Sequence, residues 1–256
     1  MAADLCLGLR LAPLFWCSFR DPVGSNVHRS FPVPPPATLF GLVGAALGLQ
    51  QHDYSRRHEM RFAVAVEKMG ETVESYSKWM KRAEDAKDAT QKEAREAMRQ
   101  RGLLTPDESL WISTTLIRQK IIQPVFIAGI LCSNEVAEEL ITAFKNPFFP
   151  LCLGESDDVV DVEILGLDEP VSTSEAATGT VDGVHAGGTL ASLPTRFNME
   201  KRNRWTCEKW LVTVPDPVSN QGISLPGLVE CHGQRWHFEP EANGASTKEI
   251  AQLSLL

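Results

Sequence analysis

The sequence contains no long hydrophobic segment and no recognisable export signal. Its longest apolar stretch, residues 38–49, is rich in glycine and too short to span a bilayer. Asp4 and Arg10 interrupt the apolar run at the N-terminus, and no small-residue cleavage site follows it. A composition of 43% hydrophobic residues in 256 is sufficient for a large core, which excludes a disordered protein. We therefore expect a soluble, cytoplasmic protein without membrane contact.

Cysteine and histidine are few and dispersed. The closest two of the six cysteines, Cys6 and Cys17, are 11 positions apart, so no CxxC pair exists. Cys231 and His232 are neighbours in sequence, but adjacent residues do not have the spacing of zinc ligands. We interpret the six cysteines as buried, reduced thiols. We expect neither a metal site nor another cofactor.

The motifs of common enzyme classes are also missing. Residues 183–189 have the glycine spacing of a phosphate-binding loop, but no lysine follows them. The sequence has no GxGxxG after a strand, no GxSxG elbow and no HExxH motif. Glu155, Asp157 and Asp158 are interpreted as a solvated turn rather than as a magnesium site. A metal-independent ribonuclease needs a side chain, such as a tyrosine, that removes the 2′-hydroxyl proton. The two tyrosines of this sequence lie in or near charged segments. Catalysis therefore has no positive support.

Charge is distributed unevenly along the chain. The formal net charge is −8, but residues 1–125 carry 17 basic and 14 acidic side chains, a net of +3. Residues 126–256 carry 8 basic and 19 acidic side chains, a net of −11. Because a polyanion binds to a local basic surface rather than to the total charge, the first half is the better candidate for nucleic-acid contact.

The first 167 residues alternate between strand-like and helix-like patterns. Every second residue is apolar in 5–11, 61–67 and 159–165, and strand character also covers 116–131 with a break at Pro124. Helical periodicity covers 38–50 and a second segment that Ser133 or Asn134 caps. This order is the βαββαβ pattern of ferredoxin-like domains, which RNA-recognition modules share.

Residues 71–101 interrupt that pattern. They contain eight basic and seven acidic residues without glycine or proline, and their apolar residues follow a helical period. We expect a helical arm, or thumb, inserted between the second and third strands. Strand and loop signals dominate residues 168–240, and 241–256 read as a polar tail. We therefore predict an α+β fold: a ferredoxin-like domain over 1–167 with the inserted thumb 71–101, followed by a smaller β-rich lobe.

Three stretches resemble the motifs of one protein family. The most specific is Phe31-Pro-Val-Pro-Pro-Pro-Ala-Thr-Leu-Phe-Gly-Leu-Val-Gly-Ala-Ala-Leu-Gly48. The others are Asn146-Pro-Phe-Phe-Pro-Leu-Cys-Leu-Gly154-Glu-Ser-Asp and Leu193-Pro-Thr-Arg-Phe197, with Arg202 and Arg204 downstream. In this order they resemble the CRISPR-associated family-five proteins, which are RAMP-superfamily subunits of type I Cascade complexes. Phe19-Arg20-Asp21-Pro22 is most similar to the I-A and I-B branches, and not to the I-C branch, whose members cut the precursor RNA.

The resemblance implies a non-catalytic, RNA-binding subunit of an antiviral ribonucleoprotein complex. In this role the chain caps the 5′ handle of CRISPR RNA (crRNA) and contacts the backbone subunit and the large subunit of Cascade. Target DNA is reached only indirectly, through the complex, because guide base pairing supplies sequence specificity. A separate endoribonuclease processes the precursor, and the thumb lies over the RNA where the handle passes into the spacer.

Basic and flat side chains are the candidates for RNA contact, because single-stranded RNA is held through its phosphates and stacked bases. They lie in the loop before the proline run (Arg20, His28, Arg29 and Ser30), in the thumb (Lys78, Trp79, Lys81 and Arg82), at the third strand (Arg118 and Lys120) and in the acidic half (Arg196, Arg202 and Arg204). Three alternatives without RNA contact stay open. They are an ion pair between Arg20 and Asp21, packing of the thumb against the backbone subunit, and a position of Arg118 on a solvated face of the sheet.

Six residues of the first motif are assigned a structural role: Pro34, Pro35, Pro36, Gly41, Gly44 and Gly48. The prolines exclude helix until the run ends. Each glycine costs the following helix about 1 kcal/mol relative to alanine. We therefore expect close backbone packing against the glycines to offset that cost.

Two other functions stay open at the sequence level. An endoribonuclease that cuts at the handle requires a base in residues 17–30, where only His28 is present. A general RNA-recognition module outside CRISPR biology requires exposed aromatic residues on the sheet. The outward positions of the first strand are instead Cys6, Gly8, Arg10 and Ala12.

Overall fold

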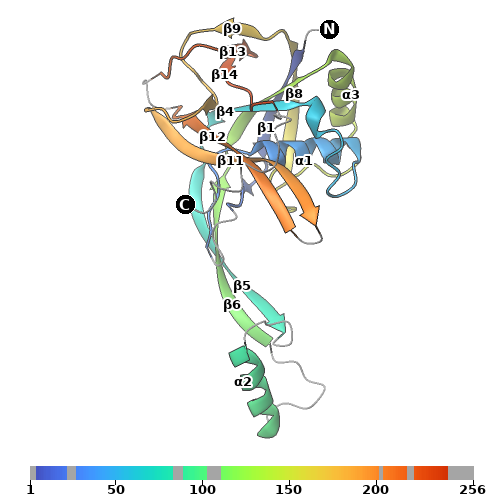
Figure 1. The fold of residues 1–256 in the computed structure, drawn as a ribbon, viewed down its shortest axis with the longest axis vertical. Coiled ribbons are helices and arrows are strands. Elements are labelled where there is room, and N and C mark those ends of the chain that lie inside the picture. The colour runs from blue at the N-terminus through green and yellow to red at the C-terminus, as the bar shows by residue number, and fades with distance from the viewer. Residues whose placement is uncertain are drawn as a thin grey trace. The chain divides into compact units, whose positions relative to one another are not determined.

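The computed structural model describes residues 4–21, 27–82, 89–102, 111–201, 204–217 and 222–241. These residues divide into two compact units (Figure 1). The core unit comprises Met1–Phe19, Phe31–Glu71 and Ile121–Leu256, and the arm unit comprises Arg20–Ser30 and Thr72–Lys120, each as far as it is described. Residues 168–240, predicted as a smaller β-rich lobe, belong to the core unit as far as they are described. No described helix is long and apolar enough to span a membrane.

A four-stranded antiparallel sheet is the centre of the core unit. Its order is β4-β7-β1-β8, formed by β1 (Leu5–Pro13), β4 (Arg61–Lys68), β7 (Val125–Cys132) and β8 (Val160–Asp168). The alternating segments of the sequence analysis coincide with these strands. Since β1 is a central strand, its leucines are buried on one face of the sheet, as the period of two predicts.

Two helices connect strands of this sheet: α1 (Pro36–Leu47) follows the proline run, and α3 (Asn134–Lys145) follows β7. Pro36 begins α1 because a proline at the first helical position gives up only an N–H that has no partner there. Gly48 ends it with a φ of 74°, and its N–H donates to the carbonyl of Gly44. The predicted cap of α3 is confirmed, because the Ser133 hydroxyl accepts a hydrogen bond from Val136 N–H at 3.4 Å.

The main hydrophobic cluster lies between these helices and one face of the sheet. It contains Leu39, Leu42 and Val43 of α1, Leu140 of α3 and Phe126 of β7, each less than 3% exposed. The alternation of apolar residues in the strands and their helical spacing in α1 and α3 therefore converge on one layer. This packing fixes the position of the segment that follows α1, which forms the pocket described below.

The opposite face of the sheet is covered by a small sheet of β9 (Val171–Thr173), β13 (Leu228–Cys231) and β14 (Gln234–Trp236). A Cβ added at Gly8 of β1 would lie 2.6 Å from the His232 ring, and one at Gly129 of β7 would lie 2.5 Å from the Trp236 ring. Glycine is required at both positions because no side chain fits there. This face is therefore not free for the base stacking of a general RNA-recognition module.

A long hairpin completes the core unit. It consists of β11 (Gly188–Lys201) and β12 (Arg204–Pro215), with the short β10 (Val181–Asp182) beside β12. The sequence analysis predicted strands in residues 168–240 without placing this hairpin. Gly188, Ser192 and Pro194 give β11 a weak local strand signal, and β11 forms because it pairs with β12.

The arm unit contains β3 (Val27–His28), β5 (Glu71–Arg82), α2 (Ala89–Gln100) and β6 (Trp111–Ile122), whose last two residues enter the core unit and pair with β2 (Trp16–Cys17). The helical prediction for 71–101 is wrong over residues 71–82, which form a strand paired with β6. Val73 and Ser75 are half-buried while Glu74 and Tyr76 are exposed, a period of two that the long charged run obscured. The helix itself covers only Ala89–Gln100.

Candidate nucleic-acid interface

The loop predicted to hold RNA is attached to β6 inside the arm unit. Val27 and His28 pair in parallel with Ile117 and Arg118, and Ser30 N–H donates to Oε1 of Gln119 at 3.3 Å. Two segments about 90 positions apart in the sequence are therefore neighbours in space. This arrangement brings the candidates Arg20, His28, Arg29 and Ser30 into one unit with Arg118 and Lys120.

The base of this loop is closed by its own backbone. Arg20 and Ser30 form an antiparallel bridge, and Asp21 N–H donates to the carbonyl of Arg29 at 2.8 Å. Both arginine side chains are exposed, and among the described residues no ion pair involves either of them. The alternative that Arg20 only pairs with Asp21 finds no support in the structure. Two cations held on a closed loop can contact the phosphates of one strand.

The remaining loop candidates differ in accessibility. His28 is 6% exposed, which suits a packing role and not contact with a base or a 2′-hydroxyl. Ser30 is half-buried and uses its N–H for Gln119. Arg118 and Lys120 are half-buried on β6. The Ser75 hydroxyl of β5 donates to the Arg118 carbonyl at 3.4 Å, which ties β5 to β6 at this level.

The thumb candidates all lie on β5 rather than on a helix. Lys78 is exposed and makes no ion pair within the described residues. Trp79, Lys81 and Arg82 continue the strand, and their side chains lie outside the described part. The helical face predicted for these four residues is therefore replaced by a strand.

The basic cluster of the acidic half belongs to the core unit. Arg196 is half-buried on β11 opposite Glu208 of β12. Burial raises the pKa of Glu239, and the charges of Arg57 and, less strongly, Arg196 oppose that rise. Arg202 lies outside the described residues, and Arg204 begins β12 with its side chain outside the description. Arg196 thus lies opposite an acidic residue of the neighbouring strand, which the sequence did not reveal.

Sequence reasoning missed a buried ion pair between Arg57 and Glu239. Nη2 of Arg57 lies 2.6 Å from both carboxylate oxygens of Glu239, and the two side chains are 4% and 1% exposed. Arg57 also donates to the carbonyls of Met60 and Thr195. The 182 positions between the pair left no local signal for it. The ion pair fixes the last described residues of the chain onto the core unit.

The motif prolines are buried, which agrees with their structural assignment. At Gly48 the positive φ and the Phe148 ring, 2.7 Å from an added Cβ, both require glycine. The close packing expected at the other two glycines is not found. A Cβ at Gly41 would have no heavy atom within 4 Å, and one at Gly44 would reach only Leu49 at 3.8 Å. Their cost to the helix, about 0.5–1 kcal/mol each, is not offset by packing in the described chain.

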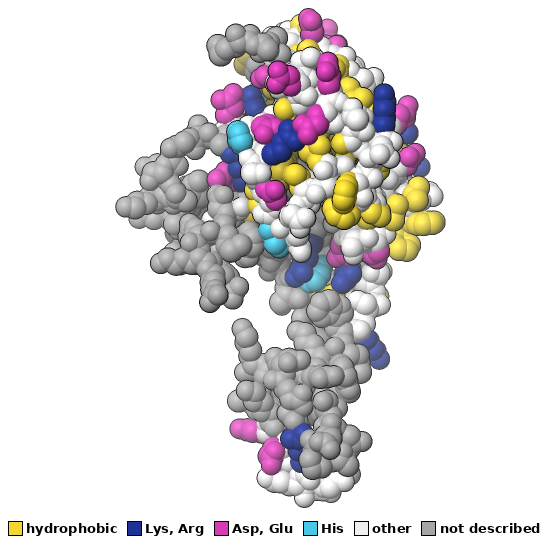
Figure 2. Space-filling view, turned by 90° about the vertical axis from the view of Figure 1, so that its right-hand side faces the viewer, with side chains coloured by type: hydrophobic (Ala, Val, Ile, Leu, Met, Phe, Trp, Pro, Cys, Tyr) yellow, Lys and Arg dark blue, Asp and Glu magenta, His cyan; other side chains and the backbone are white. Residues whose placement is uncertain are grey.

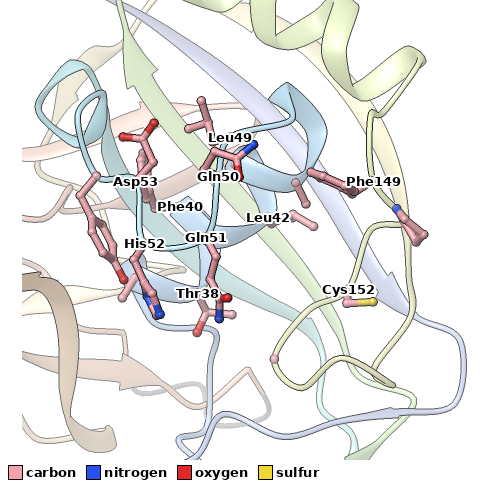
Figure 3. Close-up of a pocket in the computed structure, with 17 residues that line it drawn as sticks. Thr38, Phe40, Leu42, Leu49, Gln50, Gln51, His52, Asp53, Phe149 and Cys152 are labelled. Atoms are coloured by element: carbon pink, nitrogen blue, oxygen red, sulfur yellow. The ribbon is translucent and has the colours of Figure 1, made fainter. Parts of the chain in front are cut away.

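Both glycines line a pocket of about 790 Å³ in the core unit (Figure 3). Its walls come from α1, from the turn at residues 49–54 and from residues 149–154. The polar lining includes Thr38, Gln50 and Gln51, and His52 adopts a φ of 66°, rare for a residue other than glycine. Asp53 at its rim accepts a hydrogen bond from Ser55 N–H at 3.0 Å, and the contacts with Ser55 lower its pKa.

Four side chains that could exchange a proton differ in their surroundings. Tyr54 stacks on Phe40 with ring centroids 5.9 Å apart, and burial raises the pKa of its hydroxyl. Tyr76 is exposed on β5 and its hydroxyl lies 3.4 Å from Glu74. Burial also raises the pKa of the Cys17 thiol. Asp158 is 1% exposed and accepts hydrogen bonds from Ser18 and Glu155 N–H, so the expected solvated acidic turn is in part a buried structural cap.

The surface charge of the core unit is mixed. On the face drawn in Figure 2, acidic and basic side chains of the described residues are interspersed. Arg10 pairs with Glu67 at 2.7 Å and Arg56 pairs with Glu139 at 2.7 Å, so these cations are already engaged. The unpaired cations described above are in the arm unit, which agrees with the positive balance of the first half of the sequence.

One family model matches most of the chain. A sequence profile described as "CRISPR-associated protein (Cas_Cas5)" matches residues 10–208. Comparison with curated proteins gave no match. A solved structure described as "CRISPR RNA-guided surveillance complex" is similar with a TM-score of 0.54 and 17% identity, over 98% of each chain. At this identity the likeness concerns the fold alone.

Two further solved structures are less similar. One is described as "Crystal structure of Cas protein" and has a TM-score of 0.46 and 18% identity, over 83% of this chain and 99% of the other. The second is a CRISPR protein from Archaeoglobus fulgidus with a TM-score of 0.40 and 15% identity, over 90% of this chain and 97% of the other.

Proposed function

Because the chain belongs to the CRISPR-associated Cas5 family, we propose that it is a non-catalytic subunit of a type I surveillance complex that binds and caps the 5′ handle of crRNA. The observation that carries the proposal is the closed loop of the arm unit. It presents Arg20 and Arg29 exposed and without ion pairs in the described chain, next to β6 with Arg118 and Lys120. Such a loop provides the phosphate contacts by which a single strand is held.

The fold agrees with this role. The strand order β4-β7-β1-β8, with helices after the first and third strands, supports the proposal of a ferredoxin-like domain in which β5, α2 and β6 are the inserted thumb. The face of the sheet opposite the helices is occupied by β13 and β14. RNA contact is therefore assigned to the arm unit and to loops, in contrast to a general RNA-recognition module.

The proposal includes partners and location. The chain contacts a backbone subunit and the large subunit of the complex, and reaches target DNA through them. It acts in the cytoplasm, where crRNA is made. The segment Phe19-Arg20-Asp21-Pro22 favours the I-A and I-B branches. A non-catalytic role is supported by His28, the histidine of the loop, which is 6% exposed and so out of reach of a 2′-hydroxyl.

The decisive experiment is affinity purification of the tagged full chain from its native host, followed by sequencing of the 5′ ends of the bound RNA. A single repeat-derived 5′ end, recovered together with a backbone subunit, is the expected result. The same purification with His28→Ala distinguishes a cap from a nuclease, since unprocessed precursor in the variant alone would indicate cleavage by this chain. Heterogeneous RNA without repeat sequence would contradict the proposal.

A further inference from the structure

The small sheet of β9, β13 and β14 brings together two cysteines that are 225 positions apart in the sequence. The Sγ atom of Cys231, the last residue of β13, lies 2.9 Å from the Sγ atom of Cys6 on β1. Cys231 is 2% exposed and Cys6 is 0% exposed, and both are free thiols. They belong to the hydrophobic cluster that joins the small sheet to the central sheet. Their distance in the sequence gave no sign of this contact.

The backbone around both cysteines is held by the residue that follows Cys231. His232 N–H donates to Oδ2 of Asp168, the residue opposite Cys6 on β8, at 2.8 Å. Nε2 of His232 lies 2.9 Å from the Cys6 carbonyl oxygen, which can only accept, so this nitrogen carries a proton. The His232 ring also covers Gly8, where no side chain would fit. The two sulfurs are therefore kept together by contacts that do not involve the thiols.

The surroundings make one of the two sulfurs the better nucleophile. The hydrogen bond with Cys6 lowers the pKa of the Cys231 thiol, burial opposes this effect, and Trp236 lowers the pKa further. The same hydrogen bond, together with burial, raises the pKa of Cys6, which therefore keeps its proton. Because the thiolate is the form of cysteine that reacts with oxidants, Cys231 is the sulfur that reacts first and Cys6 is the thiol beside it.

We propose that Cys6 and Cys231 form an oxidation site that hydrogen peroxide closes to a disulfide, which joins the small sheet covalently to β1. The Cys231 sulfur attacks one peroxide oxygen, the O–O bond breaks, and a sulfenic acid and one water are formed. The Cys6 sulfur then attacks the sulfenic sulfur, its proton leaves with the hydroxyl as a second water, and the S–S bond forms. Two thiols are oxidised to one disulfide, and one peroxide is reduced to two waters.

The position of the pair is compatible with this reaction. A disulfide bond is about 2.05 Å long, so the sulfurs have to approach by only about 1 Å from their present distance. Hydrogen peroxide is close to water in size, and the strands of the small sheet contain only three or four residues. Such an element opens locally at a lower cost than the whole fold unfolds. In a reducing compartment the pair stays reduced until an oxidant is present. Both cysteines lie in the core unit, so the inference does not depend on RNA contact by the arm unit.

The test treats the purified full chain with hydrogen peroxide, alkylates the remaining thiols under denaturing conditions and maps the unreduced peptides by mass spectrometry. The expected product is a monomer in which the peptides of Cys6 and Cys231 are linked, while Cys17 is alkylated. Because the disulfide closes a loop over 225 positions, the melting temperature is expected to rise by about 5–10 °C. Reduction with dithiothreitol should reverse the rise.

Cys231→Ala removes the proposed nucleophile and should abolish both the link and the rise in melting temperature. Cys17→Ala, the same substitution at an equally buried cysteine, is the matched control and should retain both. The inference is overturned if all six cysteines of the treated wild type are alkylated, if Cys231 is oxidised without a link to Cys6, or if the link forms without a rise in melting temperature. The peptide map is made on the wild type, so the test is valid even where a variant fails to fold.

Discussion

Removing the carboxylate of Glu239 tests how the end of the core unit is held. Glu239 is 1% exposed and accepts hydrogen bonds from Nη2 of Arg57 at 2.6 Å and from Phe62 N–H at 3.1 Å. Arg57 is 4% exposed, donates to two backbone carbonyls, and its guanidinium lies 4.9 Å from the Phe62 ring centroid. The variant Glu239→Leu therefore leaves a buried cation with hydrogen bonds but without a counter-charge.

The expected loss is about 3 kcal/mol of unfolding free energy, the lower end of the range for breaking a buried ion pair from one side. The remaining carbonyl and ring contacts of Arg57 favour the lower end. Arg57→Met leaves the carboxylate buried and should cost a similar amount. The double variant removes both charges at nearly constant volume, and should lie within about 1–2 kcal/mol of the wild type because no charge is then desolvated.

The assay is urea unfolding of the full-length variants, followed by tryptophan fluorescence. The stability of the double variant is the decisive measurement. If the charges of Arg57 and Glu239 are strongly coupled, the double variant must be more stable than either single variant. Additive losses, or a double variant less stable than both single variants, would refute the argument that the cost comes from an uncompensated buried charge.

Three other predictions follow from the loop, the helix cap and the acidic helix. Replacing both Arg20 and Arg29 by alanine should weaken RNA binding and make the slope of log affinity against log salt shallower by about 1.4, since each phosphate contact on a single strand contributes about 0.7; anisotropy titrations at several salt concentrations measure this, and an unchanged slope would contradict phosphate contact. Gly48→Ala should lower the melting temperature, because φ is 74° and Phe148 occupies the space of the methyl group, whereas Gly41→Ala should raise it; equal shifts would argue against this difference. Neutralising the exposed carboxylates of α3 (Glu135, Glu138 and Glu139) should leave RNA affinity unchanged, and lost affinity would place RNA on this helix.

Local chemistry was enough to predict several elements. The alternating leucines of β1 and the Ser133 cap of α3 each act through neighbours in the chain. The helix predicted over 38–50 is also present, but it begins two residues earlier, at Pro36, and ends at Leu47. The same applies to the uneven charge, which pointed to the half of the sequence that contains the arm unit. The family motifs were also readable, and the profile match over residues 10–208 supports the assignment drawn from them.

Tertiary structure decided the features that depend on distant partners. Residues 71–82 became a strand because β6 offers a pairing edge, and β11 formed despite its weak strand residues because β12 lies beside it. The attachment of Val27 and His28 to β6 and the pairing of Arg57 with Glu239 join segments that no local pattern connects. The pocket beside α1, whose lining comes from α1 and from residues 49–54 and 149–154, belongs to the same class. The sequence alone determined which residues are available for each element, and packing between remote segments determined which of them meet, because contact energies depend on neighbours in space and not on neighbours in the chain.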